Sequence, residues 1–477
     1  MTGFGLDVVP DQIPGVKILQ GDCLQTLKSL PSSYAQMCCT SPPYFGLRDY
    51  GTATWEGGDP NCDHIKVTAA QAYQTSTLGL NRGGHSESNA AFTSKVQQFR
   101  SKCKKCGATR VDDQIGLEDS PEQYIAKMVA VGRELYRVLR DDGLWFLNLG
   151  DSYCSTDKWG GGGNVGKNTT DENGEVPAWA IRTKRPKIKG LPPGNLLGIP
   201  WRVALALQAD GWILRSDIIW HSTNKMPESV QNRPSKAHEY IFMFAKKKGY
   251  FYDAEAIKEK QSGPLITRPV DQRGELGVNH HGQAGRIIED NGYRNKRSVW
   301  TVPVGNFRGA HFAAFPPKLI EPCVLAGTSE VGCCPTCGKP WMRIVERDRQ
   351  PTRPGTNSKV SAAGQTGGAY NPPGQSAHSN ARDVSNVVGN RDPKRHCTIV
   401  TTTKWVQGCV CPPKPPVPCV VLDPFGGAFT TAVVAALHGR RSIMCELNPD
   451  YIEMGKRRLW KAYNSEQATK ARAKYHQ

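Results

Sequence analysis

The chain has 477 residues, of which 38% are hydrophobic, and its 61 Lys and Arg against 43 Asp and Glu give a formal charge of +18. This composition suffices for a folded α/β domain with added modules and excludes a disordered tail, a membrane protein and a small disulfide scaffold. Because no apolar run spans a bilayer and the first residues do not form a signal peptide, we expect a cytoplasmic protein without a membrane partner. The positive charge favours a polyanionic partner such as nucleic acid.

The first 60 residues predict two strands separated by a helix. An apolar stretch over residues 16–19 leads into Gly21-Asp22, and leucines then follow at helical spacing. A second apolar run, residues 35–39, ends in Ser41-Pro42-Pro43-Tyr44. Polar residues therefore follow both predicted strands.

The middle of the chain repeats this alternation. Ser120-Pro121-Glu122-Gln123 combines an N-cap, a proline at the first helical position and a capping-box glutamine. The helix that follows is expected to end at residues 141–143, before a buried strand over 144–149. A further helix and two strands are predicted over residues 199–207, 212–220 and 239–245. Strands that alternate with helices in this way predict an α/β fold with a mostly parallel, doubly wound sheet.

The strongest local signal lies in the last hundred residues. An apolar strand over 417–422 leads into Asp423-Pro424-Phe425-Gly426-Gly427, a helix and a second strand that ends in Glu446. Such a unit is typical of nucleoside binding, because the glycines let the backbone approach the ligand and the distal carboxylate accepts hydrogen bonds from ribose hydroxyls. The spacings of phosphate-binding loops are absent, and Asp423 suits a ligand with a cationic amino-acid end. S-adenosylmethionine has both that end and a ribose.

The Ser41-Pro42-Pro43-Tyr44 segment predicts how an exocyclic amino group is activated. The amino nitrogen of cytosine or adenine is a poor nucleophile, because its lone pair is delocalised into the ring. The Ser41 side chain and the Pro42 carbonyl can accept its hydrogens, and the two prolines hold these acceptors in place. Tyr44 offers a face on which a flipped base stacks. The methyl group would then pass directly to the nitrogen, without a covalent enzyme intermediate.

The sixteen cysteines include two groups with the spacing of zinc ligands. In a reducing compartment, closely spaced cysteine pairs indicate metal rather than disulfides. A glycine follows each CxxC pair, where a tight knuckle requires it. Four protein ligands in each group predict a closed structural zinc site, with Cys333 and Cys397 as alternative ligands in the second. The predicted sets are Cys62, His64, Cys103 and Cys106, and Cys334, Cys337, Cys409 and Cys411.

Taken together, these motifs resemble those of β-class DNA amino-methyltransferases, in which the catalytic motif precedes the cofactor motif along the chain. Residues 41–44 match the catalytic tetrad, residues 423–427 the cofactor loop, and residues 446–451 the ribose-binding segment. The resemblance implies a Rossmann-like class I methyltransferase fold with permuted motif order, S-adenosylmethionine as cofactor and double-stranded DNA as partner. It also implies a prokaryotic or phage protein of the restriction-modification type.

The resemblance assigns further roles. Asp22 would contact the adenine amino group, residues 311–317 would close over the methionine end of the cofactor, and residues 220–227 and 238–242 would flank the target base. Two positions depart from the family pattern, since Phe429 replaces a glycine and Ser222 stands where lysine is common. The implied cofactor-binding residues are Asp22, Phe315, Pro316, Asp423, Phe425, Gly427, Thr430 and Glu446.

The leading serine of the tetrad bears on the target base. Within the family, serine is associated with N4 of cytosine and Asp or Asn with N6 of adenine, so we expect N4-cytosine methylation, with N6-adenine as the alternative. C5 methylation is disfavoured, because the Pro-Cys pairs at 322–323 and 418–419 fall in a predicted helix and strand. Less favoured still are amino methylation of RNA or protein and a non-catalytic, zinc-stabilised DNA-binding protein.

The chain divides into a permuted methyltransferase domain and its insertions. The domain comprises residues 1–60, 115–252, 305–332 and 412–465, with 305–332 closing over the cofactor. Zinc-binding insertions occupy 61–114 and 333–411, target recognition falls in 253–304, and 466–477 form a basic tail. We expect flexible segments at 152–190 and 346–396. The oligomeric state is open, with a homodimer as one alternative. Residues expected to contact DNA are Arg182, Lys184, Arg185, Arg294, Lys296 and Arg297, together with Lys456, Arg457 and Arg458.

Overall fold

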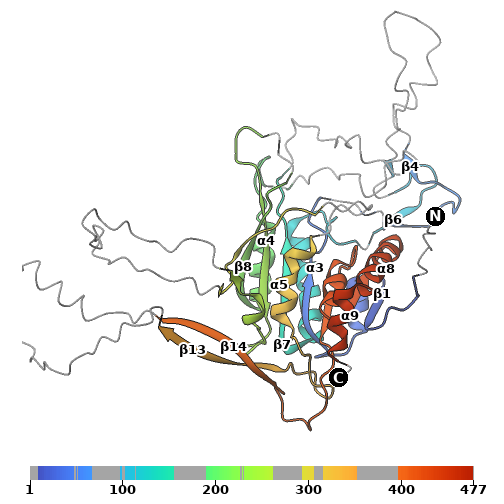
Figure 1. The fold of residues 1–477 in the computed structure, drawn as a ribbon. Coiled ribbons are helices and arrows are strands. Elements are labelled where there is room, and N and C mark those ends of the chain that lie inside the picture. Colours follow the sequence, from blue (N-terminus) through green and yellow to red (C-terminus); the bar gives the residue numbers. More distant parts are fainter. Residues whose placement is uncertain are drawn as a thin grey trace, which may run out of the picture. The chain divides into compact units, whose positions relative to one another are not determined.

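Figure 1 shows the computed structural model of the chain, which describes residues 9–47, 50, 52–66, 97–98, 102–112, 114–154, 188, 190–225, 228, 230–260, 293–305, 315–351 and 396–475. The chain forms two compact units. The larger contains Met1–Ile257, Arg297–Met342 and Gln407–Gln477, and the smaller contains Lys258–Lys296 and Arg343–Val406. None of the helices in the described ranges has the length and apolar character that a membrane span needs.

An eight-stranded sheet lies at the centre of the larger unit. All neighbouring strands are parallel except those on either side of β9, which runs antiparallel to both. The predicted mostly parallel, doubly wound sheet is therefore confirmed. In spatial order the strands are β1 (Val16–Gln20), β16 (Arg441–Glu446), β15 (Val420–Asp423), β2 (Ala35–Thr40), β7 (Leu139–Leu149), β9 (His238–Ala245), β8 (Ile213–His221) and β12 (Val299–Thr301).

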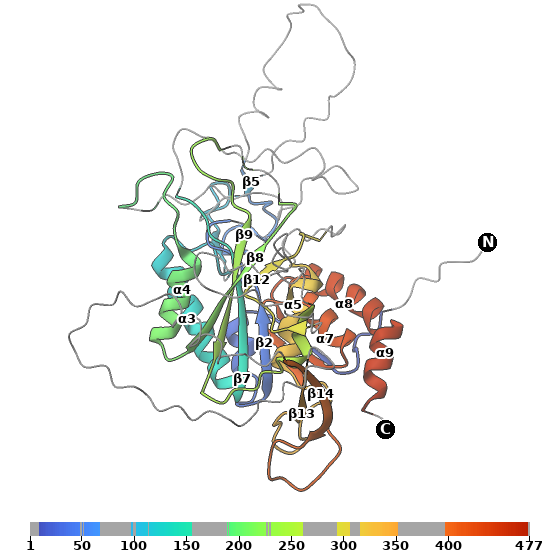
Figure 2. The same ribbon diagram turned by 60° about the vertical axis from the view of Figure 1, so that its left-hand side comes forward.

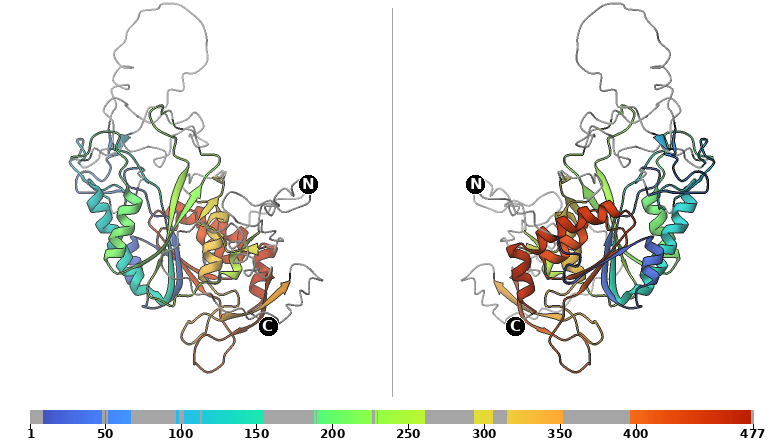
Figure 3. Two further views of the ribbon diagram at one scale, coloured as in Figure 1. Left: turned by 90° about the vertical axis from the view of Figure 1, so that its left-hand side faces the viewer. Right: turned by 90° about the vertical axis from the view of Figure 1, so that its right-hand side faces the viewer.

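Helices cover both faces of the sheet (Figures 2 and 3). Alternate residues of β2 serve opposite layers, because Cys38 packs with the first group of helices while Met37 and Cys39 pack with the second. The first group is α1 (Cys23–Lys28), α3 (Pro121–Val138) and α4 (Ile199–Ala209). The second group is α5 (Pro317–Gly327), α7 (Thr430–Leu437), α8 (Pro449–Tyr463) and α9 (Glu466–Ala473).

Helix α3 begins as predicted and ends earlier. The Ser120 hydroxyl accepts a hydrogen bond from the Gln123 amide and so caps the helix. The chain enters β7 directly after the helix, and the turn expected at residues 141–143 is instead an irregularity inside the strand. There, Ala35 pairs with Leu139 but Met37 pairs with Leu144, so the residues between form a bulge.

Short antiparallel ribbons form the insertions. In the larger unit, β3 (Thr54–Glu56) pairs with β6 (Thr109–Val111), and β4 (Ile65–Lys66) pairs with β5 (Gln97–Gln98). In the smaller unit, β10 (Glu259–Lys260) pairs with β11 (Tyr293–Arg294), and β13 (Met342–Pro351) pairs with β14 (His396–Val406). Of the segment 346–396 that was expected to be flexible, residues 346–351 lie in β13 and residue 396 begins β14, while residues 352–395 are outside the described part. The predicted basic tail forms α9 from residue 466.

Candidate active site

The predicted functional residues gather along one edge of the sheet, at the carboxyl ends of adjacent strands. Asp22 follows β1, Glu446 ends β16, Asp423 ends β15, and Ser41 follows β2. The pairing of Gln20 with Glu446 sets the first two strand ends side by side. Ligands of open α/β sheets bind at this edge.

Hydrogen bonds to Pro43 and Tyr44 hold the tetrad in place. The buried Tyr124 hydroxyl of α3 donates to the Pro43 carbonyl at 3.0 Å. Ser41 Oγ donates to the Tyr44 hydroxyl at 3.3 Å. Pro42 is buried, and among the described residues no hydrogen bond reaches its carbonyl.

The hydroxyl of Tyr44, which lies shortly after β2, contacts residues of β7 and β9. It donates to Glu239 Oε2 at 2.7 Å, and Asn148 Oδ1 lies 3.0 Å away on β7. A phenol has one proton, and the shorter contact to the charged carboxylate takes it. The other carboxylate oxygen of Glu239 pairs with Lys225 Nζ at 3.0 Å. Burial and the Glu239 carboxylate raise the pKa of Tyr44 well above its usual value, so Tyr44 stays a neutral hydroxyl.

Gly150 makes room for this arrangement. A Cβ on Gly150 would lie 2.5 Å from Tyr44 Cε2 and 3.4 Å from the carboxyl carbon of Glu239. Any larger residue would therefore displace the tyrosine ring. Gly150 thus covers one edge of the Tyr44 ring, which is half-buried.

Asp423 is buried and accepts hydrogen bonds from β2, from the cofactor loop and from α7. Its Oδ1 accepts from Thr40 Oγ1 at 2.5 Å and from the Phe425 amide at 3.0 Å, and its Oδ2 accepts from Thr431 Oγ1 at 2.7 Å. The residue is 2% exposed, and burial raises the pKa of its carboxyl to about 7. Asp423 thus shapes the cofactor loop and ties it to β2.

Glu446 and Asp22 organise the two neighbouring strand ends. Glu446 Oε2 accepts from the Gly427 amide at 2.6 Å and its Oε1 from the Asn448 amide at 2.9 Å. Burial raises the pKa of Glu446. Asp22 Oδ1 caps α1 by accepting from the Leu24 and Gln25 amides. Both carboxylates keep lone pairs for further donors, since an ionised carboxylate has about four acceptor positions.

Phe429, which departs from the family pattern, packs its ring against the loop, because a Cβ on Gly426 would lie 3.0 Å from that ring. Its backbone is left-handed, with φ of 57°, and its ring is fully buried between α7 and α8. A Cβ on Gly455 of α8 would lie 2.5 Å from that ring. The glycine at position 455 therefore provides the space that the phenylalanine needs.

The remaining predicted cofactor residues flank this loop. Phe425 is half-buried, and the Thr430 hydroxyl accepts from Arg458 Nη1 at 2.6 Å. Arg458 also donates to the Ala428 carbonyl, so the expectation that it lies along the DNA was wrong: this guanidinium holds the cofactor loop. Phe315 is buried and Pro316 precedes α5, whereas residues 306–314, with most of the predicted closing segment, are outside the described part.

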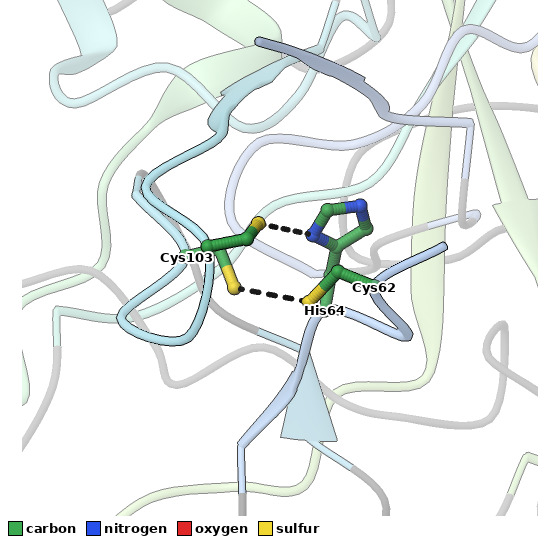
Figure 4. Close-up of side chains that lie close together, drawn as sticks. Cys62, His64 and Cys103 are labelled. Carbon is green, nitrogen blue, oxygen red and sulfur yellow. Dashed lines mark hydrogen bonds between the residues drawn. The ribbon is translucent and has the colours of Figure 1, made fainter. Parts of the chain in front are cut away.

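The first cysteine group converges at one point. The ligand atoms of Cys62, His64, Cys103 and Cys106 all lie within 4.8 Å of one another. Figure 4 shows the side chain of Cys62 facing that of Cys103, and their two sulfurs are 3.8 Å apart. The sulfur of Cys106 lies 3.6 Å from His64 Nδ1. The imidazole stacks on Trp55, with ring centroids 4.4 Å apart. Thiolates around tetrahedral zinc lie roughly 3.8 Å apart, so the donor set fits this metal.

The second group converges in the same way. The ligand atoms of Cys334, Cys337, Cys409 and Cys411 also lie within 4.8 Å of one another. Its knuckle matches the first, because the Gly338 amide donates to the Cys334 carbonyl as the Gly107 amide donates to the Cys103 carbonyl, each at 2.8 Å. Cys333 is not part of the cluster, since its thiol contacts the Val417 carbonyl at 3.4 Å. The side chain of Cys397 is outside the described part.

Each cluster touches the domain at a different place. Gly116, which follows the strand leading from the first cluster, has its carbonyl bonded to the Gly46 amide beside the tetrad. The second cluster docks at the opposite edge of the sheet, where Gln36 Nε2 donates to the Gly338 carbonyl at 2.9 Å and Arg140 donates to the Cys337 carbonyl. A metal at either centre would thus order a segment that contacts the sheet.

Of the residues expected to contact DNA, only some can be placed. Arg294 pairs with Glu259 at 2.8 Å within the smaller unit, and the Arg297 carbonyl accepts from Trp300 Nε1 at 2.6 Å. Lys296 is exposed. The three predicted contacts Arg182, Lys184 and Arg185 are outside the described ranges.

The sequence motifs did not indicate the contacts that connect the tetrad to its neighbours. Asn148 contacts the Tyr44 hydroxyl, and Thr40 joins the tetrad strand to the cofactor loop. Glu239 and Lys225 fall in the segments 238–242 and 220–227 that the resemblance set beside the target base, but the hydrogen bond of Glu239 to Tyr44 and its ion pair with Lys225 were not predicted.

Comparison with known proteins agrees with this arrangement. A family model described as N6_N4_Mtase, DNA methylase, matches residues 35–334 and 419–457. The type II methyltransferase M.Cfr9I of Citrobacter freundii is 35% identical over 319 residues, which cover 67% of this chain and 75% of the relative. M.XycI of Xanthomonas campestris pv. cyanopsidis is 36% identical over 314 residues, 66% of this chain and 73% of the relative. The solved PvuII DNA methyltransferase, cytosine-N4-specific, covers 98% of this chain and 95% of its own at 13% identity and a TM-score of 0.41. The family model spans more than half of the sequence, and the first relative is 35% identical over 67% of this chain. The chain therefore belongs to the N6_N4_Mtase family of DNA methylases.

Proposed function

We propose that this DNA methylase transfers a methyl group from S-adenosylmethionine to N4 of a cytosine flipped out of a specific duplex sequence. The observation that carries the proposal is Ser41 at the head of the tetrad, beside the Pro42 carbonyl. The two oxygens can accept the hydrogens of one amino group and direct its lone pair toward the methyl group. Direct attack by the nitrogen needs no nucleophile from the protein.

The residues at the carboxyl ends of β1, β15 and β16 support S-adenosylmethionine as the methyl donor. Glu446 is placed to accept ribose hydroxyls, and the backbone at Gly427, with φ of 50°, allows close approach of the ligand. Asp22 lies at the neighbouring strand end, where it can meet the adenine amino group. When bound, the cofactor supplies an electrophilic methyl group at a sulfonium centre.

Two further parts of the proposal concern partners. We assign a structural zinc ion to each cysteine cluster, because four ligands of the right type and spacing leave no open position for chemistry. We assign contact with duplex DNA to Arg294, Lys296 and Arg297 and to the basic residues 182–185, since bidentate arginines read guanine and phosphate. The relatives, type II methyltransferases of bacteria, support a cytoplasmic role in restriction-modification.

The test is mass spectrometry of nucleosides from duplex DNA incubated with the protein and isotopically labelled S-adenosylmethionine. Labelled N4-methylcytosine is expected. Labelled N6-methyladenine alone would overturn the assignment of the target base, and label on RNA or protein but not DNA would overturn the substrate. Ser41→Ala is the control, expected to bind the cofactor normally and to transfer no methyl group. Equal loss of both properties would mean that Ser41 is structural.

A further inference from the structure

The carboxylate of Glu239 is linked to the tetrad through an unbroken chain of hydrogen bonds. Ser41 Oγ donates to the Tyr44 hydroxyl, and the Tyr44 hydroxyl donates to Glu239 Oε2. Both donors point toward the carboxylate, so the lone pairs of Ser41 Oγ remain free to accept from the target amino group. The two distances, 3.3 Å and 2.7 Å, shorten toward the charged end.

Amino methylation releases one proton, and its acceptor is not among the residues of the tetrad. The nitrogen forms a bond to the methyl carbon while the carbon–sulfur bond breaks and its electrons stay on sulfur. The nitrogen then carries one proton more than the neutral product. A serine hydroxyl and a proline carbonyl can orient this proton but are too weakly basic to keep it.

We propose that Glu239 takes this proton through Ser41 and Tyr44. Ser41 Oγ receives the proton from nitrogen as its own proton passes to the Tyr44 oxygen, and the Tyr44 proton passes to Glu239 Oε2. Both hydroxyls end neutral and Glu239 ends as a carboxylic acid. Glu239 is a positioning residue in the ground state, because it fixes the Tyr44 hydroxyl, and the proton acceptor during transfer.

The other carboxylates at this edge are committed to backbone amides or buried hydroxyls. Asp423 is held by Thr40, Thr431 and the Phe425 amide. Asp151 caps α4 through the Gly198 and Ile199 amides. Among the described residues, Glu239 is therefore the carboxylate that a hydrogen-bond chain joins to Ser41.

The surroundings of Glu239 suit a proton acceptor, which must release the proton to solvent after each turnover. Its side chain is 16% exposed and that of Lys225 is 32% exposed, so the pair reaches solvent. Lys225 Nζ holds Oε1 and leaves Oε2 for Tyr44.

The decisive experiment is single-turnover methyl transfer by Glu239→Gln, Tyr44→Phe and the double variant. Glu239→Gln keeps an acceptor oxygen and the shape of the side chain but cannot take a proton. We expect each single variant to slow transfer by about 100-fold, as loss of a general base does, with unchanged affinity for S-adenosylmethionine and DNA. Because both groups serve one chain, the double variant should be no slower than either single variant.

Two controls separate this role from a structural one. Glu134→Gln removes another ion-paired glutamate, on α3, and should leave the rate unchanged. Glu239→Asp keeps a carboxylate and should recover at least tenfold over Glu239→Gln. A Glu239→Gln rate within threefold of the parent protein, or losses that multiply in the double variant, would overturn the proposal. The inference holds for either target base, since any exocyclic amino group must lose this proton, so its failure is separable from that of the N4 assignment.

Discussion

Thr40 donates a 2.5 Å hydrogen bond to Asp423 across 383 positions of sequence. Thr40 is the last residue of β2, directly before the tetrad, and Asp423 begins the cofactor loop. This buried contact thus adds to the pairing of β2 with β15 in joining the two halves of the active site, which are separated along the chain.

Loss of the hydrogen bond from Thr40 to Asp423 should impair catalysis more than loss of the hydrogen bond from Thr431 to Asp423. Thr40→Val and Thr431→Val each delete one buried hydrogen bond to Asp423, at a cost of about 1–3 kcal/mol in the free energy of unfolding. Only Thr40 adjoins Ser41, and a small shift of a reacting group can cost up to about 100-fold in rate. We expect at least a tenfold lower kcat for Thr40→Val than for Thr431→Val at similar thermal stability. Equal activity losses would argue against this coupling.

The ionisation of Asp423 should make the protein less stable as pH rises. Its pKa is about 7 in the folded chain, against 3.8 as the usual value, so the folded state binds more protons between these limits. Stability attributable to this group is therefore present below about pH 4 and is lost as pH rises to about 7 and beyond. Asn at this position can accept from Thr40 and the Phe425 amide and donate to Thr431, whose hydroxyl can turn to the Cys39 carbonyl.

Denaturant unfolding of the parent protein and Asp423→Asn at about pH 5 and about pH 8 tests this ionisation. The stability of the variant relative to the parent should increase by about 1.4 kcal/mol for each pH unit from about pH 5 to about pH 7, the pKa of Asp423 in the folded chain, and should then level off. A relative stability that stays constant over this range would contradict the raised pKa.

The two cysteine clusters should each hold one zinc ion. Elemental analysis should find two zinc ions per chain in the parent protein, and one in Cys103→Ser or Cys334→Ser, since each variant removes one of four ligands. Cys154→Ser, which changes a buried cysteine outside both clusters, should retain two. Two ions in Cys103→Ser or Cys334→Ser would refute the assigned ligands.

The effects of substitutions at Gly455 and Phe429 on the free energy of unfolding should be coupled. Gly455→Ala places a Cβ 2.5 Å from the Phe429 ring, and overpacking of this kind costs about 1–3 kcal/mol in the free energy of unfolding. In the Phe429→Gly background, the same alanine should cost much less. Thermal unfolding of the four proteins measures the coupling, and an equal cost in both backgrounds would show that the ring is not the obstacle.

The elements and motifs could be predicted because their signals are local. Apolar runs that end in Gly21-Asp22, in the tetrad and in the 423–427 loop mark the strand ends, and the CxxC pairs mark the metal clusters. The bulge at residues 141–143 could not be predicted, because an Asp-Asp-Gly sequence suits a turn equally well and only pairing with β2 decides between them.

The contacts that tune the site could not be predicted, because they join distant segments. Tyr44 and Glu239 are 195 positions apart, and nothing in the local pattern of either indicates the other. Asp423 was expected to attract a cationic ligand, whereas burial under Thr40 and Thr431 makes it an internal anchor. Burial of a polar residue depends on the tertiary structure rather than on the sequence around it.

The order of strands in the sheet constrains how the chain folds as it leaves the ribosome. Strands β15 and β16 are synthesised after the other strands of this sheet, yet they lie between β1 and β2, which precede those other strands along the chain. Until residue 446 emerges, β1 lacks a neighbour and one side of β2 is an open edge, which is a hazard for aggregation. The nascent chain must therefore keep β1 and β2 apart until β15 and β16 are made, and a product truncated before residue 417 would lack the two strands that join β1 to the rest of the sheet.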